Sequence, residues 1–122
     1  MNSNLQENIG QNGQKKSPRL AAGIKNYLVD IDGVICEDIP NEEPERMKTA
    51  QEIPGARETI NQLYNQGNII TFFTARTEDL AEITADWLNQ RGFKYHRIIF
   101  NKPRGGNYVY IDDKEIEYKN SL

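Results

Sequence analysis

The sequence predicts a single α/β domain built on a mainly parallel sheet. A chain of 122 residues is long enough for one domain. From residue 25 onward, short apolar segments of strand character alternate with segments of helical periodicity. This alternation implies parallel strands joined by right-handed crossovers. Several of the strand-like segments also end in charged or hydroxyl residues, which is typical of a site at one edge of the sheet.

The first 23 residues differ from the rest in composition. They are rich in Asn, Gln, Gly, Ser and Lys, and their apolar residues are scattered. Such a segment cannot bury enough surface to offset the entropy lost on ordering it. We therefore expect residues 1–23 to form a mobile polar tail and residues 24–122 to form the single folded domain.

The first strand and the segment after it are predicted from residues 25–54. Residues 25–32 contain β-branched and apolar residues and end in carboxylates, so they predict a buried strand that places acids at its C-terminal end. Residues 36–54 hold six acids and two bases with little periodicity. This is expected to be a long loop or small flap, and such loops are usually functional.

Two helices and a second strand follow. A helix is expected after Pro54-Gly55, with Gly67 beyond its C-terminus, and residues 68–73 predict a buried strand that ends at Thr74. Thr77 is the expected N-cap of the next helix, which Arg91 and Gly92 close. The expected core positions of the two helices are Ile60, Leu63 and Tyr64, then Leu80, Ile83, Trp87 and Leu88.

The last predicted strands are residues 95–100 and 107–111, the latter ending in Asp112-Asp113. Ligands bind outside the carboxyl ends of the strands in open α/β sheets, so the polar residues there should converge. Clustered carboxylates without Cys or His ligands favour a hard cation, and Mg²⁺ fits such a site. Lys102 and the Thr74 hydroxyl suit phosphate oxygens. The convergent residues are Asp30, Asp32, Thr74, Lys102, Asp112 and Asp113.

In this order, the residues resemble the four motifs of the haloacid dehalogenase-like superfamily. Asp30-Ile31-Asp32-Gly33-Val34-Ile35 looks like the first motif, and Thr74 matches the second. Lys102, followed by Pro103, matches the third, and Asp112-Asp113 matches the adjacent-acid form of the fourth. The resemblance covers roughly residues 24–114. It implies a Rossmann-like three-layer sandwich, and the short gaps between motifs imply a capless member without a substantial cap domain.

The resemblance also implies a role for each matching residue. Asp30 would be the nucleophile and a metal ligand, and Asp32 would be the general acid/base and would offer its carbonyl to Mg²⁺. Thr74 and the Ala75 N–H would hold the phosphoryl group, which Lys102 would neutralise. Asp112 would complete the metal site with Asp113 beside it. Only residues 114–122 follow the fourth motif, where the family fold usually adds a helix and often a strand, so the sheet is expected either to be short or to have its edge covered by a neighbouring copy in a homo-oligomer.

The implied function is a Mg²⁺-dependent phosphatase that hydrolyses a small phosphomonoester, such as a sugar phosphate, through an aspartyl-phosphate on Asp30. Two alternatives stay open: a non-catalytic phosphate-binding or regulatory module of the same fold, and a phosphoacceptor signalling domain. The motif order argues against the latter, because a receiver carries its acidic pair early and its phosphoacceptor aspartate near the middle.

The remaining features limit the partners. A formal net charge of -3 offers no general attraction to nucleic acid or an anionic membrane, and the absence of an apolar leader and of paired cysteines predicts a cytoplasmic protein. Arg76 is expected to be either a substrate contact or a surface ion pair, and Arg104 a possible substrate contact. Structural roles are expected for three further residues: His96, Cys36 and Trp87.

Overall fold

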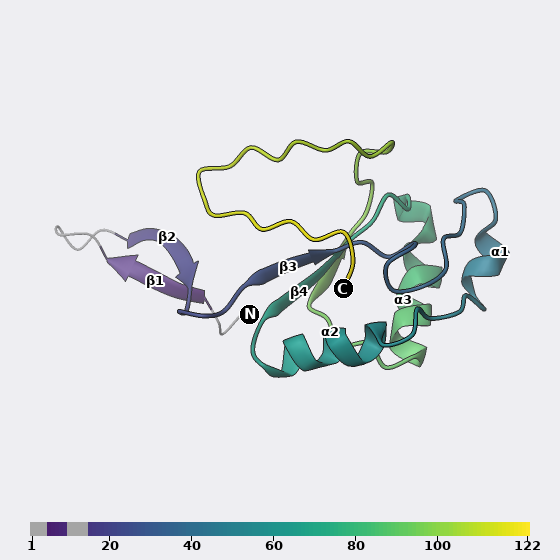
Figure 1. Ribbon diagram of the computed structural model, residues 1–122, viewed down its shortest axis with the longest axis horizontal. Helices are drawn as coiled ribbons and strands as arrows, with labels where there is room; N and C mark the ends of the chain where they lie inside the picture. The colour runs from purple at the N-terminus through teal and green to yellow at the C-terminus, as the bar shows by residue number, and fades with distance from the viewer. Residues whose placement is uncertain (1–4, 10–14) are drawn as a thin grey trace.

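The computed structural model describes residues 5–9 and 15–122 (Figure 1). Two β-structures are present among them: an antiparallel pair near the N-terminus and a three-stranded sheet. In chain order the elements are β1 (Leu5–Ile9), β2 (Lys15–Leu20), β3 (Asn26–Val29), α1 (Pro44–Met47), α2 (Ala56–Asn65), β4 (Ile69–Phe73), the 3₁₀ turn η1 (Glu78–Leu80), α3 (Ala81–Gln90) and β5 (Arg97–Ile99).

The three-stranded sheet confirms the predicted α/β class. Its order is β3-β4-β5, and both pairs are parallel. Val29 lies opposite Phe72, and Phe73 lies opposite Ile99. Each crossover carries a helix, α2 between β3 and β4 and α3 between β4 and β5. The carboxyl ends of all three strands therefore meet at one edge.

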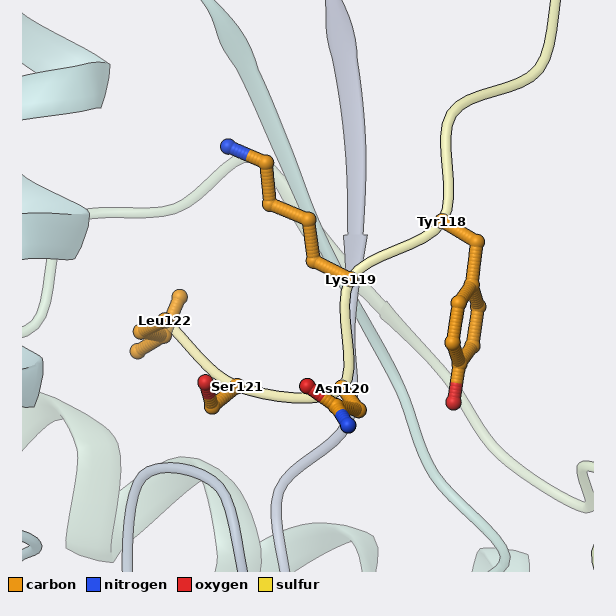
Figure 2. A pocket seen from close by; sticks show the side chains of 5 residues that line it. All are labelled: Tyr118, Lys119, Asn120, Ser121 and Leu122. Atoms are coloured by element: carbon orange, nitrogen blue, oxygen red, sulfur yellow. The ribbon is translucent and has the colours of Figure 1, made fainter.

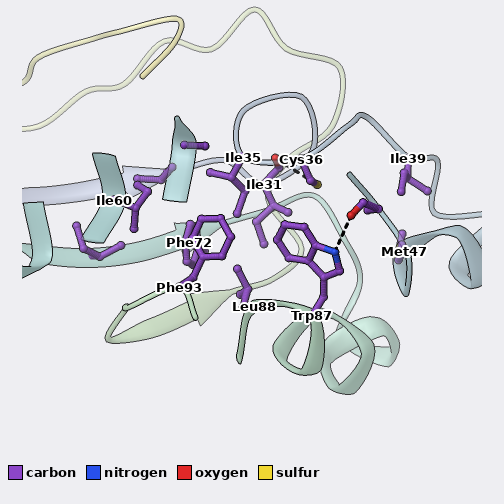
Figure 3. Close-up of a cluster of buried hydrophobic side chains, with 14 of the residues drawn as sticks. Ile31, Ile35, Cys36, Ile39, Met47, Ile60, Phe72, Trp87, Leu88 and Phe93 are labelled. Carbon is purple, nitrogen blue, oxygen red and sulfur yellow. Dashed lines mark hydrogen bonds between the residues drawn. The ribbon is translucent and has the colours of Figure 1, made fainter. Parts of the chain in front are cut away.

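The apolar core lies on one face of this sheet (Figure 3). Ile70 and Phe72 are fully buried there, and Ile60 of α2 and Leu88 of α3 belong to the same cluster. Trp87 stacks on Phe93 at a ring distance of 5.5 Å. The three-layer sandwich that the resemblance implies, with helices on the opposite face as well, stays a prediction.

That second face and the β3 edge expose apolar side chains. Leu28, which pairs with Thr71 on this face, is 53% exposed. The predicted strand at residues 107–111 does not form, and Val109 and Ile111 are 84% and 91% exposed. The prediction was wrong because β-branched residues favour an extended backbone but do not supply the neighbouring strand that turns it into a ladder. In the described sheet β3 is an edge strand, and Leu28 is not buried as the sequence predicts.

The N-terminal segment also differs from its prediction. β1 and β2 pair antiparallel, with Leu5 opposite Leu20 and Ile9 opposite Lys15. The sequence predicts no regular structure there, because polar composition argues against a core; backbone N–H and C=O groups can nevertheless pair without one. Residues 1–4 and 10–14 lie outside the described residues, and the expectation of a mobile tail is left as a prediction for them. No helix in the described ranges has the length and apolar character to cross a membrane.

The segment 36–54 is a structured flap that contacts α3 and the loop after β4. It contains α1, and its ends pair with each other through the Glu37 N–H to the Gln51 carbonyl at 2.9 Å. The Trp87 indole N–H donates to the Ala50 carbonyl at 3.0 Å, which confirms a packing role for Trp87. Asn41 Nδ2 donates to the Ala75 carbonyl at 3.2 Å, so the flap lies against the loop after β4.

Candidate active site

Asp30 directly follows β3 and faces a lysine. Its Oδ1 accepts the Ile31 N–H at 2.8 Å and lies 3.3 Å from Lys102 Nζ. The Asp30 side chain is 38% exposed and that of Lys102 is 14% exposed. Among the residues that the structure describes, none donates to Asp30 Oδ2. One carboxylate oxygen is thus fixed, and the other is open to a ligand.

Lys102 reaches Asp30 because the chain after β5 is tied to the chain after β4. The Thr74 N–H donates to the Ile99 carbonyl, and the Lys102 N–H donates back to the Thr74 carbonyl, both at 2.9 Å. Between them Asn101 takes a positive φ of 63°, a conformation that asparagine tolerates better than most residues. The two predicted phosphate-binding positions, 74 and 102, are therefore adjacent through the backbone.

Thr74 and Ala75 form the turn beyond β4. Thr74 is fully buried, and its hydroxyl accepts the Arg76 backbone N–H at 3.1 Å. Ala75 is half-buried, with its carbonyl bonded to Asn41. The Thr74 hydroxyl therefore shapes the loop, and the accessible part of this turn begins at Ala75.

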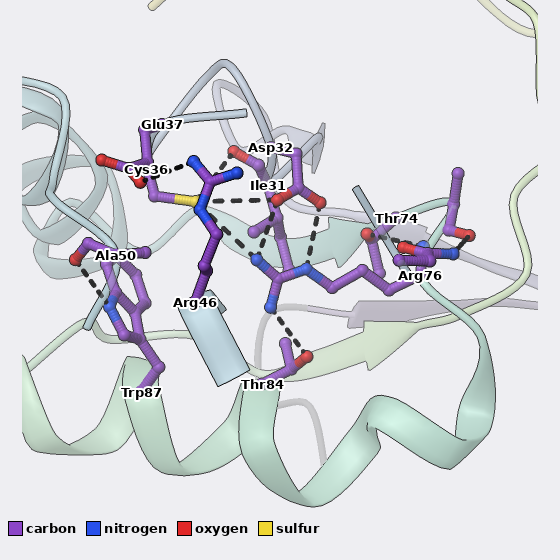
Figure 4. Close-up of polar contacts among 12 residues, drawn as sticks. Ile31, Asp32, Cys36, Glu37, Arg46, Ala50, Thr74, Arg76, Thr84 and Trp87 are labelled. Carbon is purple, nitrogen blue, oxygen red and sulfur yellow. Dashed lines mark hydrogen bonds and ion pairs between the residues drawn. The ribbon is translucent and has the colours of Figure 1, made fainter. Parts of the chain in front are cut away.

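Arg76 is buried at 2% exposure and binds Asp32 through two nitrogens (Figure 4). Its Nε lies 3.0 Å from Oδ2, and its Nη2 lies 2.8 Å from Oδ1. The third nitrogen, Nη1, donates to the Thr84 hydroxyl at 2.9 Å. Both roles predicted for Arg76 need correction. Its ion pair is buried rather than on the surface, and its guanidinium is hydrogen-bonded to Asp32 and Thr84 rather than free to contact a substrate.

The turn between Asp30 and Cys36 sets the direction of Asp32. Gly33 has a positive φ of 84°, which favours glycine, and its N–H donates to the Cys36 carbonyl at 2.8 Å. Cys36 is fully buried behind this turn, 4.0 Å from Asp32 Oδ1. Burial raises the pKa of its thiol to about 12, and the negative charge of Asp32 adds to the rise. Cys36 is therefore a packing residue, as the sequence predicts.

Asp112 and Asp113 are not brought to Asp30 and Asp32 in this structure. Both are exposed, Asp112 accepts the Tyr110 hydroxyl at 3.0 Å, and Asp113 lies 3.0 Å from Lys114 Nζ. The hydrogen bond from Lys114 lowers the pKa of the Asp113 carboxyl. Nowhere in the described ranges do three or more His, Cys, Asp or Glu side chains group as metal ligands. The cause is the missing fourth strand, whose carboxyl end would have placed these acids at the sheet edge.

Residues 103–122 form an exposed C-terminal arm that loops out from the end of β5 and returns toward β3 (Figure 1). Arg104 is exposed on it. On the returning part, Lys25 Nζ contacts Glu117 Oε1 at 2.5 Å, and Leu122 lines a shallow groove together with Gly33. Figure 2 shows residues 118–122 around a second, open depression, which these arm residues alone line.

Three residues near the candidate site were not identified from the sequence. Thr84 lies within a helical apolar stripe, Asn41 within a loop, and Tyr108 within the expected strand. Tyr108 places its ring 5.6 Å from Lys102 Nζ, and its hydroxyl donates to the Pro103 carbonyl. His96, by contrast, is structural as expected: its Nδ1 accepts the Ile70 N–H at 3.0 Å.

Comparison with known proteins supports the fold only. No protein-family model matches the sequence, and no curated protein matches it significantly. A crystal structure of a target protein from Vibrio cholerae matches with a TM-score of 0.56 and 23% identity, over 76% of this chain and 83% of that chain. A chain in the structure of the Pnkp1/Rnl/Hen1 complex matches with a TM-score of 0.60 and 16% identity, over 71% of this chain. The match spans only 32% of that second chain.

Proposed function

We propose that this chain is a Mg²⁺-dependent phosphatase of the haloacid dehalogenase-like type, with a Rossmann-like fold and no substantial cap. Its substrate in this proposal is a small phosphomonoester, hydrolysed through an aspartyl-phosphate on Asp30. The proposal rests on the order of the four sequence motifs and on the placement of three of them at the carboxyl ends of parallel strands.

The contact between Asp30 and Lys102 is the observation that carries the proposal. A carboxylate beside an ammonium at 3.3 Å, both partly open to solvent, is suited to receive a phosphoryl group, because the cation offsets the charge of the phosphate oxygens. Ala75 borders the same region, since its loop is joined to Lys102 through the Thr74 carbonyl. The Ala75 N–H would add a hydrogen bond to the phosphate.

The proposed reaction has two steps. In the first, Asp32 takes up a solvent proton on a lone pair that is not bonded to Arg76, Asp30 Oδ2 attacks phosphorus, the bond from phosphorus to the ester oxygen breaks, and that oxygen takes the proton from Asp32. In the second, the Asp32 carboxylate takes a proton from water, the water oxygen attacks phosphorus, and the bond to Asp30 breaks. The products are the alcohol and inorganic phosphate, and Asp32 releases its proton to solvent, so both carboxylates return to their starting state.

Asp32 is held in place for this role by Arg76. Both Asp32 oxygens accept a hydrogen bond from the guanidinium, but each carboxylate oxygen carries a second lone pair. The Asp32 side chain is 16% exposed, so one edge is open to a leaving group. Arg76 thus fixes the orientation of the proton carrier without itself contacting the substrate.

The metal site is incomplete in the described arrangement. In this proposal Asp30 and the Asp32 carbonyl would be ligands, and Asp112 and Asp113 would have to approach them. Tyr108 already lies against Lys102, so about 13 Å of extended chain separates that contact from Asp112. We therefore expect residues 109–113 to reorient when Mg²⁺ is present; the ion would supply positive charge beside the phosphoryl oxygens.

The charge of the flap favours a small substrate. Glu37, Glu43, Glu45 and Glu52 each lie within salt-bridge distance of a basic side chain. Asp38 and Glu42 have no such partner in the described part of the chain, and both are close in sequence to Asn41, whose side chain contacts Ala75. Two unpaired acids beside the site would repel a polyanion, so we propose a single phosphomonoester, such as a sugar phosphate, and no nucleic acid or membrane partner.

Asp30→Asn tests the proposal directly. With p-nitrophenyl phosphate and a panel of phosphorylated sugars, we expect Mg²⁺-dependent turnover by the wild type and a loss of at least about a thousandfold in Asp30→Asn. Asp86→Asn, an exposed acid on α3, is the matched control and should keep wild-type turnover. Retained activity in Asp30→Asn contradicts the mechanism, and a wild type that binds phosphate without turnover supports the non-catalytic module instead.

A further inference from the structure

The Lys102 ammonium contacts two aromatic rings. Its Nζ lies 5.7 Å from the Phe73 ring centroid and 5.6 Å from the Tyr108 ring centroid. Both distances fall within the range of cation–π attraction, which strengthens as the cation is removed from water. With the side chain only 14% exposed, Lys102 is held by the two rings and by Asp30 together.

The two rings differ in how they are themselves held. Phe73 is the last residue of β4, so the sheet fixes its position. Tyr108 lies on the exposed arm and is 56% exposed, yet its hydroxyl donates to the Pro103 carbonyl, next to Lys102 in sequence. This bond closes the segment 103–108 into a loop that returns the ring over the lysine.

We infer that Tyr108 is a positioning residue that directs the Lys102 ammonium toward Asp30. The lysine side chain has four rotatable bonds, and its ammonium is otherwise free to turn to water. The Tyr108 ring restricts this freedom and keeps the cation at the attacking carboxylate before a substrate arrives. The inference rests on the proposed function, since it assigns the lysine to the phosphoryl group.

Three substitutions separate this role from a general effect of the arm. Tyr108→Leu removes the ring, Tyr108→Phe keeps the ring but removes the hydroxyl, and Tyr118→Leu makes the same change at an arm residue that is 85% exposed. We expect kcat for p-nitrophenyl phosphate to fall roughly threefold to tenfold in Tyr108→Leu. Tyr108→Phe should lose less activity than Tyr108→Leu, because it keeps the ring that contacts the cation but not the hydroxyl bond to Pro103, and Tyr118→Leu should be unchanged.

Two measurements that do not depend on turnover complete the test: the NMR signals of Lys102 and the affinity for inorganic phosphate. In the NMR spectrum, the Lys102 side-chain methylene protons should be shifted by the two rings, and Tyr108→Leu alone should move them toward ordinary values. The affinity for inorganic phosphate should fall by a similar factor. Unchanged Lys102 signals in Tyr108→Leu overturn the inference, as do altered signals with unaltered kcat and phosphate affinity. A wild type that neither turns over the ester nor binds phosphate contradicts the proposed function itself.

Discussion

Arg76 and Asp32, separated by 44 positions in sequence, form a two-point ion pair in the interior of the protein, with nitrogen–oxygen distances of 3.0 and 2.8 Å. The pair joins the loop after β4 to the turn after β3, and the Thr84 hydroxyl extends it to α3. It therefore connects the two strand ends that carry the candidate nucleophile and the phosphate loop. Such a buried pair is costly to break, because the partner that remains keeps its charge without compensation.

Removing the positive charge of Arg76 should strongly reduce the free energy of unfolding. Arg76→Met leaves Asp32 without its donors, and we expect the free energy of unfolding in urea to fall by about 3 kcal/mol or more. Thr84→Val removes one acceptor of the guanidinium and should cost about 1 kcal/mol. Arg104→Met, at an exposed arginine, should change stability by less than about 0.5 kcal/mol. Equal stability of Arg76→Met and the wild type would show that the pair does not hold the two loops together.

The Cys36 thiol should make stability fall at high pH. Its pKa is raised from 9.0 to about 12 in the folded protein. Above pH 9 the unfolded chain releases this proton while the folded protein keeps it, so the native state loses stability as pH rises toward 12. At roughly pH 10.5 the wild type should have lost about 2 kcal/mol relative to the behaviour of Cys36→Ala. Parallel stability curves for the two proteins between pH 8 and 10.5 would contradict the buried, protonated thiol.

Mg²⁺ should order the part of the arm that carries the acidic pair. Without the metal, the amides of residues 109–113 are exposed, and we expect fast hydrogen exchange. Saturating Mg²⁺ should slow this exchange in the wild type and in Asp86→Asn, but not in Asp112→Asn. Mg²⁺-dependent turnover with no change in exchange at these amides would exclude the acidic pair from the metal site.

The two unpaired acids of the flap should set the preference for small substrates. In the double variant Asp38→Asn/Glu42→Gln, we expect kcat/KM for a 3′- or 5′-phosphorylated oligonucleotide to rise about tenfold at low salt and the rise to shrink at high salt. Turnover of a small sugar phosphate should change by less than about twofold. Comparable turnover of oligonucleotides and sugar phosphates by the wild type would remove the basis for this preference.

Local pattern and spacing were sufficient for the central part of the fold. Residues 69–73 form the predicted strand, and α2 and α3 bury the expected residues Ile60 and Trp87. The parallel order follows from the alternation of strands and helices, because a helical crossover returns the chain in the same direction. The neighbourhood of Asp30, Thr74 and Lys102 is predictable for the same reason.

The structure of the two terminal segments depends on contacts with other segments, which the local sequence pattern does not predict. The segment 107–111 has strand composition but no neighbouring strand, and residues 5–9 and 15–20 have polar composition but pair with each other. In both cases the presence or absence of hydrogen-bonding partners on another segment outweighs the local preference. Because residues 107–111 form no strand, Asp112 and Asp113 do not lie at the sheet edge where the sequence predicts them.

The sequence by itself determined the parallel pairing of the strands, the two crossover helices, and which strand ends carry Asp30, Thr74 and Lys102, because apolar periodicity and parallel connection act through neighbouring residues. Only the tertiary structure decided that Arg76 is buried against Asp32, that Tyr108 covers Lys102, and that the acidic pair lies away from the site. These relationships join residues that are far apart in the chain or lie on a segment outside the core. Their geometry depends on which side chains are buried together and on how their charges pair, and local sequence patterns do not determine either.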